Sequence, residues 1–357
     1  MSKQYACLVL AWGLSFSIQS ASAQTAGSQE LVRQGVALYD QGKYDEAVLR
    51  YKEALKQDAT NTTARYELAM TYNALNRNDE AVELCKQLLK QEANPASSLY
   101  NTYGNALDGL KKPKEAAKVY TDGLKRYPND GALYFNLGVT QATALQQPAE
   151  AIASMQQSVR CRPGHANSLN ALALLLQQEG NRVPALLAML RLLQVEPTGQ
   201  RATATLARFD KLMGQGVEKT GEKAVTISIS PETLKDAGKK GRADNFGPAD
   251  MLLSMSGALD YSEENKDKTP SEQLIRKLEA LISVLEELQA KKQDGFTWQY
   301  VVPYFVELKK QGYLPALAYS IQAARANSTP EVQQWLANHT ATLEELRSWS
   351  AAYPWPK

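Results

Sequence analysis

The sequence has few of the side chains on which many enzymes depend. Its 357 residues include two histidines and three cysteines, which leaves little material for a metal centre or a Cys–His nucleophile. An excess of positive charge is also missing, because 40 Lys and Arg residues face 38 Asp and Glu residues. This balance argues against nucleic acid and anionic membrane surfaces as partners. The sequence also lacks a glycine-rich phosphate loop and a nucleophile elbow, so we expect a non-catalytic protein with no cofactor and no metal.

The apolar stretch at the N-terminus, residues 6–18, is too short to span a bilayer. Lys3 precedes it, and the small residues Ala21-Ser22-Ala23 follow it, which is the pattern of a secretory signal peptide with its cleavage site. We therefore expect residues 1–23 to be a signal peptide. The mature chain would be periplasmic or secreted and would carry no integral membrane span.

Small residues recur at a spacing of 34 or 35 in the middle of the chain. One series is Gly35, Ala69, Gly104, Gly138 and Ala173. A second series follows it at an offset of 12 or 13: Ala47, Ala81, Ala116, Ala151 and Ala185. Such a period is typical of stacked helical hairpins, in which small side chains lie where two helix backbones approach closely. Pro128, Pro163 and Pro197 would end the second helices of units three to five. The period predicts five helical hairpins over residues 28–199 and an all-α fold.

The first unit resembles the consensus of the tetratricopeptide repeat (TPR) family through Tyr39, Gly42, the run Tyr44-Asp45-Glu46-Ala47, and Tyr51. Later units match it at the equivalent small and aromatic positions, and unit four departs by one extra residue in its turn, within residues 145–148. The resemblance implies a right-handed superhelix. Its concave groove would be lined by the first helix of each pair, the A helix, and its convex back by the second, the B helix.

The same resemblance implies that a peptide or protein partner binds along the A helices. We expect the partner-binding residues to be Tyr39, Tyr66, Asn73, Asn101, Asn105, Phe135, Asn136 and Asn170. This face lacks the cations with which chaperone-tail-binding members of the family clamp a terminal carboxylate. Asn101, Asn136 and Asn170 recur at spacings of 35 and 34, and each amide can both donate to and accept from a peptide group. One hypothesis is an asparagine ladder that grips an extended backbone, and the other is a row of ordinary solvated polar residues.

The two cysteines of the mature chain fall on the B helices of units two and four. Two helix layers would then separate Cys85 from Cys161, which is too far for a disulfide. Cys85 occupies an inward position. We expect it to be a small core residue rather than a reactive thiol.

After the repeats, Gln200 to Leu212 predicts a helix that caps the repeat stack, so that the solenoid spans residues 28–213. Residues 214–248 are glycine-rich and predict a linker with a short strand within residues 224–230. Residues 249–357 predict a small all-α domain. Its expected helices begin near Thr269, Phe296, Leu314, Pro330 and Thr342, with capping boxes at Thr269–Glu272 and Thr342–Glu345. All four tryptophans of the mature chain lie here, which indicates either a helical core built on large aromatics or an aromatic docking surface.

Three functions fit these features. The leading one is an exported non-catalytic scaffold that binds a peptide or protein partner in the repeat groove. The alternative is an enzyme accessory, or a weak enzyme, with a site between solenoid and C-terminal domain that would use Asp244, Asp250, Trp298 and Tyr304. The third is a cell-envelope assembly factor, which differs from the first only in its partner.

Overall fold

The computed structural model describes residues 26–221, 224–230, 233–234, 245–289, 294–325 and 328–356. The predicted signal peptide therefore lies outside the described residues. The chain divides into two compact units, residues 1–147 (the N-terminal unit) and residues 148–357 (the C-terminal unit). Each is described by itself below. The boundaries predicted for the solenoid, the linker and the C-terminal domain follow the repeat pattern, whereas the two units are defined by compact packing. The predicted boundaries therefore stay predictions.

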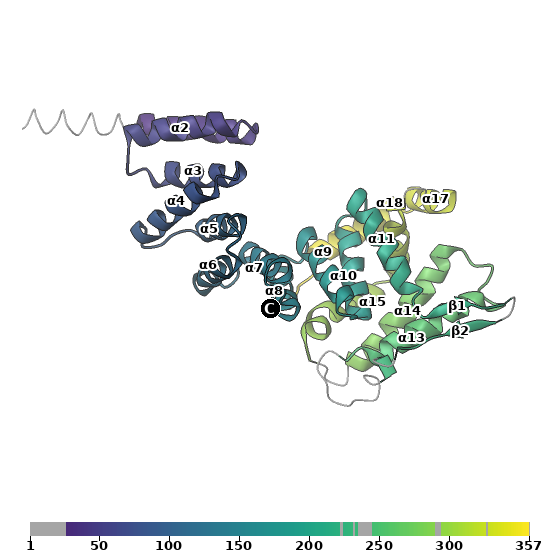
Figure 1. Ribbon diagram of the computed structural model, residues 1–357. Coiled ribbons are helices and arrows are strands. Elements are labelled where there is room, and N and C mark those ends of the chain that lie inside the picture. The colour runs from purple at the N-terminus through teal and green to yellow at the C-terminus, as the bar shows by residue number, and fades with distance from the viewer. Residues whose placement is uncertain are drawn as a thin grey trace, which may run out of the picture. The chain divides into compact units, whose positions relative to one another are not determined.

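The N-terminal unit is a succession of antiparallel helix pairs, shown in purple to teal in Figure 1. After a helix over residues 26–40, its elements are α2 (Tyr44–Gln57), α3 (Thr62–Ala74), α4 (Asn78–Gln91), α5 (Ser97–Gly109), α6 (Pro113–Arg126) and α7 (Gly131–Thr143). Each helix from α2 to α6 packs against the next one in the chain. The predicted hairpins and the all-α fold are confirmed.

In the first three repeats, the small residues of the predicted A-helix series lie in the helix crossings. In the first and third repeats the A helix carries glycine, and a Cβ atom added at Gly35 or Gly104 would overlap the ring of Tyr51 or Tyr120. Both tyrosines are fully buried. The second repeat has Ala69 instead, and the equivalent B-helix position is the smaller Cys85, also fully buried. The size of the A-helix residue thus varies inversely with that of its partner, as close packing requires.

The turns between A and B helices share a left-handed residue. Its backbone φ is positive in all five repeats, at Gly42, Asn76, Lys111, Gln146 and Gly180. This conformation ends a helix by satisfying its last carbonyls. In the first three repeats and the fifth, the next backbone N–H donates to a carbonyl five residues earlier, whereas Gln147 donates to Gln141, six residues earlier. The extra residue predicted in the turn of unit four is therefore present.

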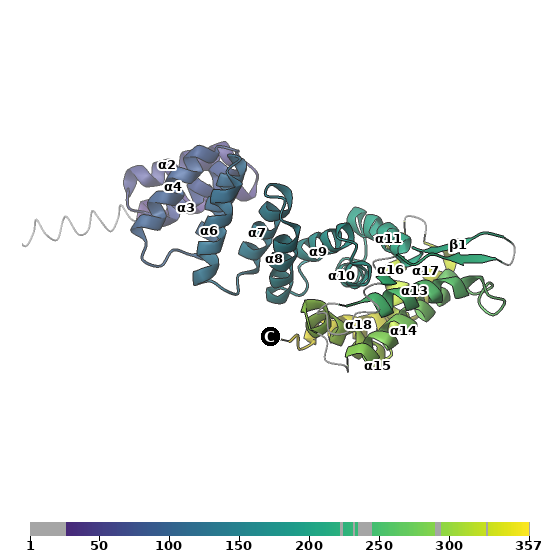
Figure 2. The same cartoon turned by 60° about the horizontal axis from the view of Figure 1, so that its bottom comes forward.

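The C-terminal unit begins with the helices α8 (Pro148–Cys161), α9 (Ala166–Gln178), α10 (Arg182–Val195) and α11 (Gln200–Met213). A two-stranded antiparallel hairpin, β1 (Val217–Lys219) and β2 (Val225–Ile227), follows with Glu218 opposite Thr226. The remaining elements are α13 (Gly247–Ala258), η1 (Leu259–Tyr261), α14 (Pro270–Gln289), η2 (Thr297–Val301), α15 (Val302–Lys310), α16 (Leu314–Gln322), α17 (Pro330–Asn338) and α18 (Thr340–Ala352). Figures 1 and 2 both show the hairpin beside α13, which contacts both strands.

Helix α10 is the centre of this unit. It is a B helix by its place in the repeats, yet every residue from Arg182 to Leu193 is buried. Its sequence is apolar on all sides, which is typical of a helix enclosed by others. Helices α9, α11, α13 and α16 all contact it. The resemblance implied an outer convex face for the B helices, and α10 departs from that expectation because helices from the last third of the chain cover it.

The capping signals were partly right. At the start of α14 the backbone N–H of Thr269 donates to the Glu272 carboxylate at 2.8 Å, and the N–H of Glu272 donates to Thr269 Oγ1 at 3.3 Å. This reciprocal pair confirms the first capping box. The second is wrong, because α18 begins at Thr340, so Thr342 lies inside the helix. Among the described residues, no helix combines the length and apolar character needed to span a membrane.

Candidate functional site

The A helices α5 and α7 carry a strip of hydrogen-bonded polar side chains. Asn101 and Asn136 occupy equivalent positions, and Asn136 Nδ2 donates to Asn101 Oδ1 at 2.9 Å. Both residues are half-buried. The described part of the chain offers no further hydrogen bond to Asn101 Nδ2 or Asn136 Oδ1. This asparagine pair therefore keeps one donor and one acceptor, which are the two groups that a peptide unit requires.

One to two turns further along α5 lie Asn105 and Asp108. The Tyr120 hydroxyl donates to Asn105 Oδ1 at 2.7 Å and to Asp108 Oδ2 at 3.1 Å. Thr140 of α7 donates to the same Asp108 oxygen at 2.6 Å. Burial raises the pKa of Asp108, and the two hydroxyl donors and Lys111 oppose that shift. The strip thus combines neutral amides with one half-buried carboxyl group.

The polar strip borders a hollow of about 370 Å³. Its lining includes Asp108 of α5, Lys111 of the turn that follows α5, and Val139, Thr140 and Thr143 of α7. Val139 is 36% exposed, which is high for a large apolar side chain. An open polar strip beside a recess of mixed polar and apolar lining suits a peptide, since main-chain amides and side chains need different surroundings.

The other predicted groove residues are more involved in packing. Tyr39 lies 5.1 Å from the Tyr44 ring, and Tyr66 packs against the cluster that contains Cys85. Asn73 Nδ2 donates to the backbone oxygen of Thr102 at 2.7 Å, and its Oδ1 is buried without a partner. Asn73 therefore joins α3 to α5. Phe135 is half-buried on α7.

Asn170, the third residue of the predicted ladder, belongs to the C-terminal unit. Its Oδ1 accepts a hydrogen bond from Arg208 of α11 at 3.3 Å. Its acceptor is thus already engaged within its own unit. The structure brings Asn101 and Asn136 together, and a binding role for any of the three stays a prediction.

The cysteines behave as expected. Cys85 is fully buried, and burial raises the pKa of its thiol to about 12, so it stays protonated near neutral pH. It forms no disulfide with Cys161. Within the described ranges there is also no group of three or more His, Cys, Asp or Glu side chains that could hold a metal ion.

The residues considered for a site between domains have separate partners. Asp244 lies outside the described residues. Asp250 pairs with Arg182 of α10, and Trp298 is buried with its ring stacked 4.3 Å from that of Phe246. The Tyr304 hydroxyl donates to Gln194 Oε1 and to Ser350 Oγ. Asp250, Trp298 and Tyr304 thus take part in distinct contacts within the C-terminal unit.

Comparison with known proteins agrees with this repeat architecture. Residues 38–102 and 103–166 each match a family model described as tetratricopeptide repeat. This part of the chain is therefore a run of tetratricopeptide repeats, which is a helical repeat scaffold, as its residues predicted.

Among curated relatives, the chain is 26% identical over 136 residues to an Hsp70-Hsp90 organising protein of Plasmodium falciparum, covering 38% of this chain and 54% of the relative. It is 25% identical over 178 residues to a TPR repeat-containing protein of Methanocaldococcus jannaschii, covering 46% of this chain and 30% of the relative. The matched region thus spans about half or less of these relatives' own length.

Solved structures of similar proteins include a thermophilic TPR protein of Thermus thermophilus, at 24% identity and a TM-score of 0.43, covering 52% of this chain and 98% of that one. Another is Pseudomonas aeruginosa pilF, at 20% identity and a TM-score of 0.46, covering 53% of this chain and 86% of that one.

Two features of the structure were not predicted. Asp108 lies on the same face as Asn101 and Asn105, at helical spacing, but the sequence does not reveal that Tyr120 and Thr140 bond to it. The second feature is a pair of buried arginines on α10, Arg182 and Arg191, each 7% exposed. Two arginines in an otherwise apolar helix were a visible signal, because a buried cation needs specific partners.

Proposed function

We propose that this protein is an exported, non-catalytic scaffold that binds an extended segment of a protein or peptide partner on the A-helix face of its N-terminal unit. The observation that carries the proposal is the hydrogen bond from Asn136 to Asn101, which leaves one amide donor and one acceptor without partners in the described residues. A main-chain peptide group can satisfy both. The tetratricopeptide repeats over residues 38–166 and the chaperone-organising name of one relative support a protein partner.

Asn101→Asp isolates the proposed contact. The aspartate keeps an oxygen that can accept from Asn136 Nδ2, and it replaces only the amino group that we assign to the partner. Loss of one hydrogen bond costs about 0.5–1.5 kcal/mol, so the affinity for a selected peptide should fall by about 2- to 10-fold. Asn129→Asp makes the same change of charge at an exposed loop position and should leave the affinity unchanged.

Peptides for this measurement can be selected from a random display library on the mature protein and then titrated by fluorescence anisotropy. The double variant Asn101→Ala/Asn136→Ala should weaken a selected peptide by about 4- to 100-fold, because it removes both groups. A photo-crosslinking residue at Val139 should capture the peptide. The same residue at Leu49, which is 60% exposed on a B helix, should not. Unchanged affinity in the double variant would reject the asparagine pair as the contact.

Export is part of the proposal and rests on residues 1–23. The mature chain should begin near Gln24 in a periplasmic or secreted fraction, which N-terminal sequencing of the fractionated protein would test. A full-length chain in the cytoplasmic fraction would contradict it. The partner could then belong to an assembly machinery of the cell envelope. The exported proteins that contain the selected peptide sequence would identify it.

A further inference from the structure

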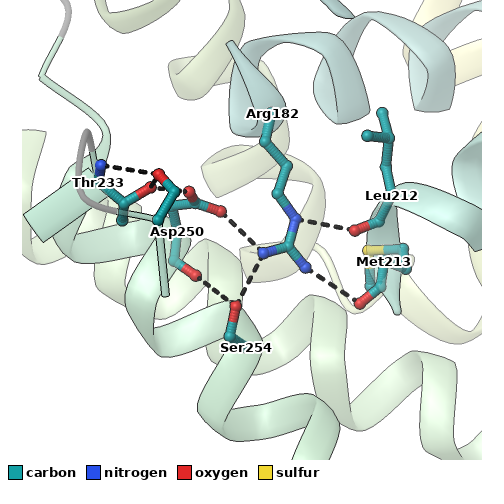
Figure 3. Close-up of polar contacts among 7 residues, drawn as sticks. Arg182, Leu212, Met213, Thr233, Asp250 and Ser254 are labelled. Atoms are coloured by element: carbon teal, nitrogen blue, oxygen red, sulfur yellow. Dashed lines mark hydrogen bonds and ion pairs between the residues drawn. The ribbon is translucent and has the colours of Figure 1, made fainter. Parts of the chain in front are cut away.

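Helix α10 carries two equally buried arginines with very different surroundings. Arg182 has every guanidinium nitrogen engaged: Nε donates to the Leu212 carbonyl, Nη2 to the Met213 carbonyl, and Nη1 to Ser254 and to the Asp250 carboxylate at 2.9 Å (Figure 3). The side-chain exposures of Arg182 and Asp250 are 7% and 18%. Arg182 shows how this unit holds a buried cation when its role is structural.

Arg191 lies nine residues later and is also 7% exposed, but it forms no ion pair within the described residues. Its Nη1 donates to three neutral oxygens: Ser350 Oγ at 2.7 Å, Gln194 Oε1 at 2.9 Å and Tyr304 OH at 3.3 Å. None of the described carboxylates pairs with it, Nε is buried without a partner, and Nη2 makes no hydrogen bond within the described residues. Burial lowers the pKa of Arg191, but a guanidinium stays charged at neutral pH.

The unbonded edge of Arg191 has a specific geometry. Nε and Nη2 present parallel N–H groups, the fork that binds both oxygens of one carboxylate. The rings of Tyr304 and Trp355 lie 4.9 and 5.3 Å from the guanidinium carbon, so they supply aromatic faces but no net charge. A buried cation with its fork unpaired is costly, which distinguishes this site from the satisfied Arg182.

Arg191 lines a cavity of about 450 Å³ within the C-terminal unit. Gln194, Arg347, Ser350 and Trp355 also line it, and the rest of the lining is apolar and includes Val195. Arg347 is 69% exposed and meets Glu344 at 3.5 Å, a weak surface pair that leaves its charge available. The lining contains no carboxylate. The cavity therefore offers two cations, two neutral polar groups and an apolar wall.

We infer that this cavity is a binding site for a carboxylate attached to a small apolar or aromatic body. The carboxylate pairs with the charged Arg191 guanidinium through its Nη2 group, and the apolar body packs against Trp355 and Val195. The carboxylate can belong to a free organic acid or to the end of a peptide, and the cavity volume accommodates either one. This inference stands independently of the proposed groove function, because the two sites lie in different units.

The probe is benzoate, with benzamide as its neutral isostere, titrated into the mature protein and followed by calorimetry and by intrinsic tryptophan fluorescence. Benzoate should bind at one site with a Kd of about a millimolar or below, the range for a ligand of about nine heavy atoms. Benzamide should bind at least about tenfold more weakly, because it cannot supply the charge. An acetylated dipeptide ending in phenylalanine, compared with its C-terminal amide, tests whether the carboxylate belongs to the end of a peptide. If the dipeptide with a free carboxylate binds more tightly than benzoate, the end of a peptide is the ligand.

Variants separate recognition from folding. Arg191→Lys keeps the charge but loses the fork, and benzoate affinity should fall by at least about tenfold. Val195→Trp fills the cavity while leaving Arg191 in place and should also block binding. Lys310→Gln removes an exposed charge outside the cavity and should leave the affinity unchanged. Circular dichroism on each variant establishes that it is folded.

Several outcomes would overturn the inference. These are equal binding of benzoate and benzamide, no saturable benzoate binding at millimolar concentrations, or unchanged affinity in both Arg191→Lys and Val195→Trp. Tighter binding of inorganic phosphate than of any carboxylate would also overturn it, because the site would then recognise a different anion.

Discussion

At the scale of single residues, the fit between A and B helices depends on pairs of side chains. Gly104 and Tyr120 are one such pair, and a methyl group on Gly104 would overlap a ring that is fully buried. The sequence predicted the small residue, because the 34-residue period marks it. It did not predict that Tyr120 also donates to Asn105 and Asp108, since the identity of hydrogen-bond partners depends on side-chain rotamers that no period encodes.

Gly104→Ala should therefore destabilise the protein by about 1–3 kcal/mol, the usual cost of overpacking a close-packed site. Urea unfolding followed by circular dichroism would measure it. The added Tyr120→Met change should recover part of the loss, because the fifth repeat places Met189 opposite Ala173 at the equivalent positions, and both are buried. If the effects of Gly104→Ala and Tyr120→Met simply add, the two residues do not share the packing contact.

At the scale of elements, helices were easier to predict than the turns between them. Apolar spacing, prolines and the Thr269–Glu272 capping box located most helices of both units. The left-handed residue of the turns was visible only at Gly42 and Gly180, because glycine is the residue that marks this conformation. Asn76, Lys111 and Gln146 adopt the same φ; asparagine does so readily, but lysine and glutamine carry no such mark in the sequence.

Lys111→Gly should increase the free energy of unfolding by up to about 1 kcal/mol, because a left-handed backbone is strained for a residue with a Cβ atom. Gly42→Ala should lower it by a similar amount. Lys112→Gly provides the matched control, since it removes the same charge one residue later, where φ is −112°. Lys112→Gly should not stabilise. Equal effects of the two lysine variants would show that charge, rather than backbone conformation, is responsible.

At the scale of the whole molecule, the repeat pattern did not reveal how the last third of the chain is used. Helix α10 belongs to the fifth repeat by sequence, yet α13 and α16 cover it. Its apolar run hinted at complete burial, but the residues that meet it come from far along the chain. Asp250 lies 68 residues after Arg182, and Ser350 lies 159 residues after Arg191. Pairings of this kind have no period, so they could not be read from the sequence.

The Arg182–Asp250 ion pair should therefore be a main support of the C-terminal unit. Asp250→Ala leaves a buried guanidinium without its counter-ion and should destabilise this unit by about 3 kcal/mol. Asp250→Asn should cost less, because its amide oxygen can still accept from Arg182. Hydrogen exchange should show protection lost in α10, α11 and α13 and kept in residues 26–147, because the affected bonds all lie within one compact unit.

Two controls make this prediction specific. Asp122→Ala removes the partner of exposed Lys125 and should cost less than about 0.5 kcal/mol, as surface ion pairs do. The double variant Arg182→Met/Asp250→Leu removes both charges and replaces them with apolar side chains, so it should be more stable than Asp250→Ala alone. If Asp250→Ala cost no more than Asp122→Ala, the Arg182 guanidinium would reach water in solution, and burial of the charge could not be the force that joins α10 to α13.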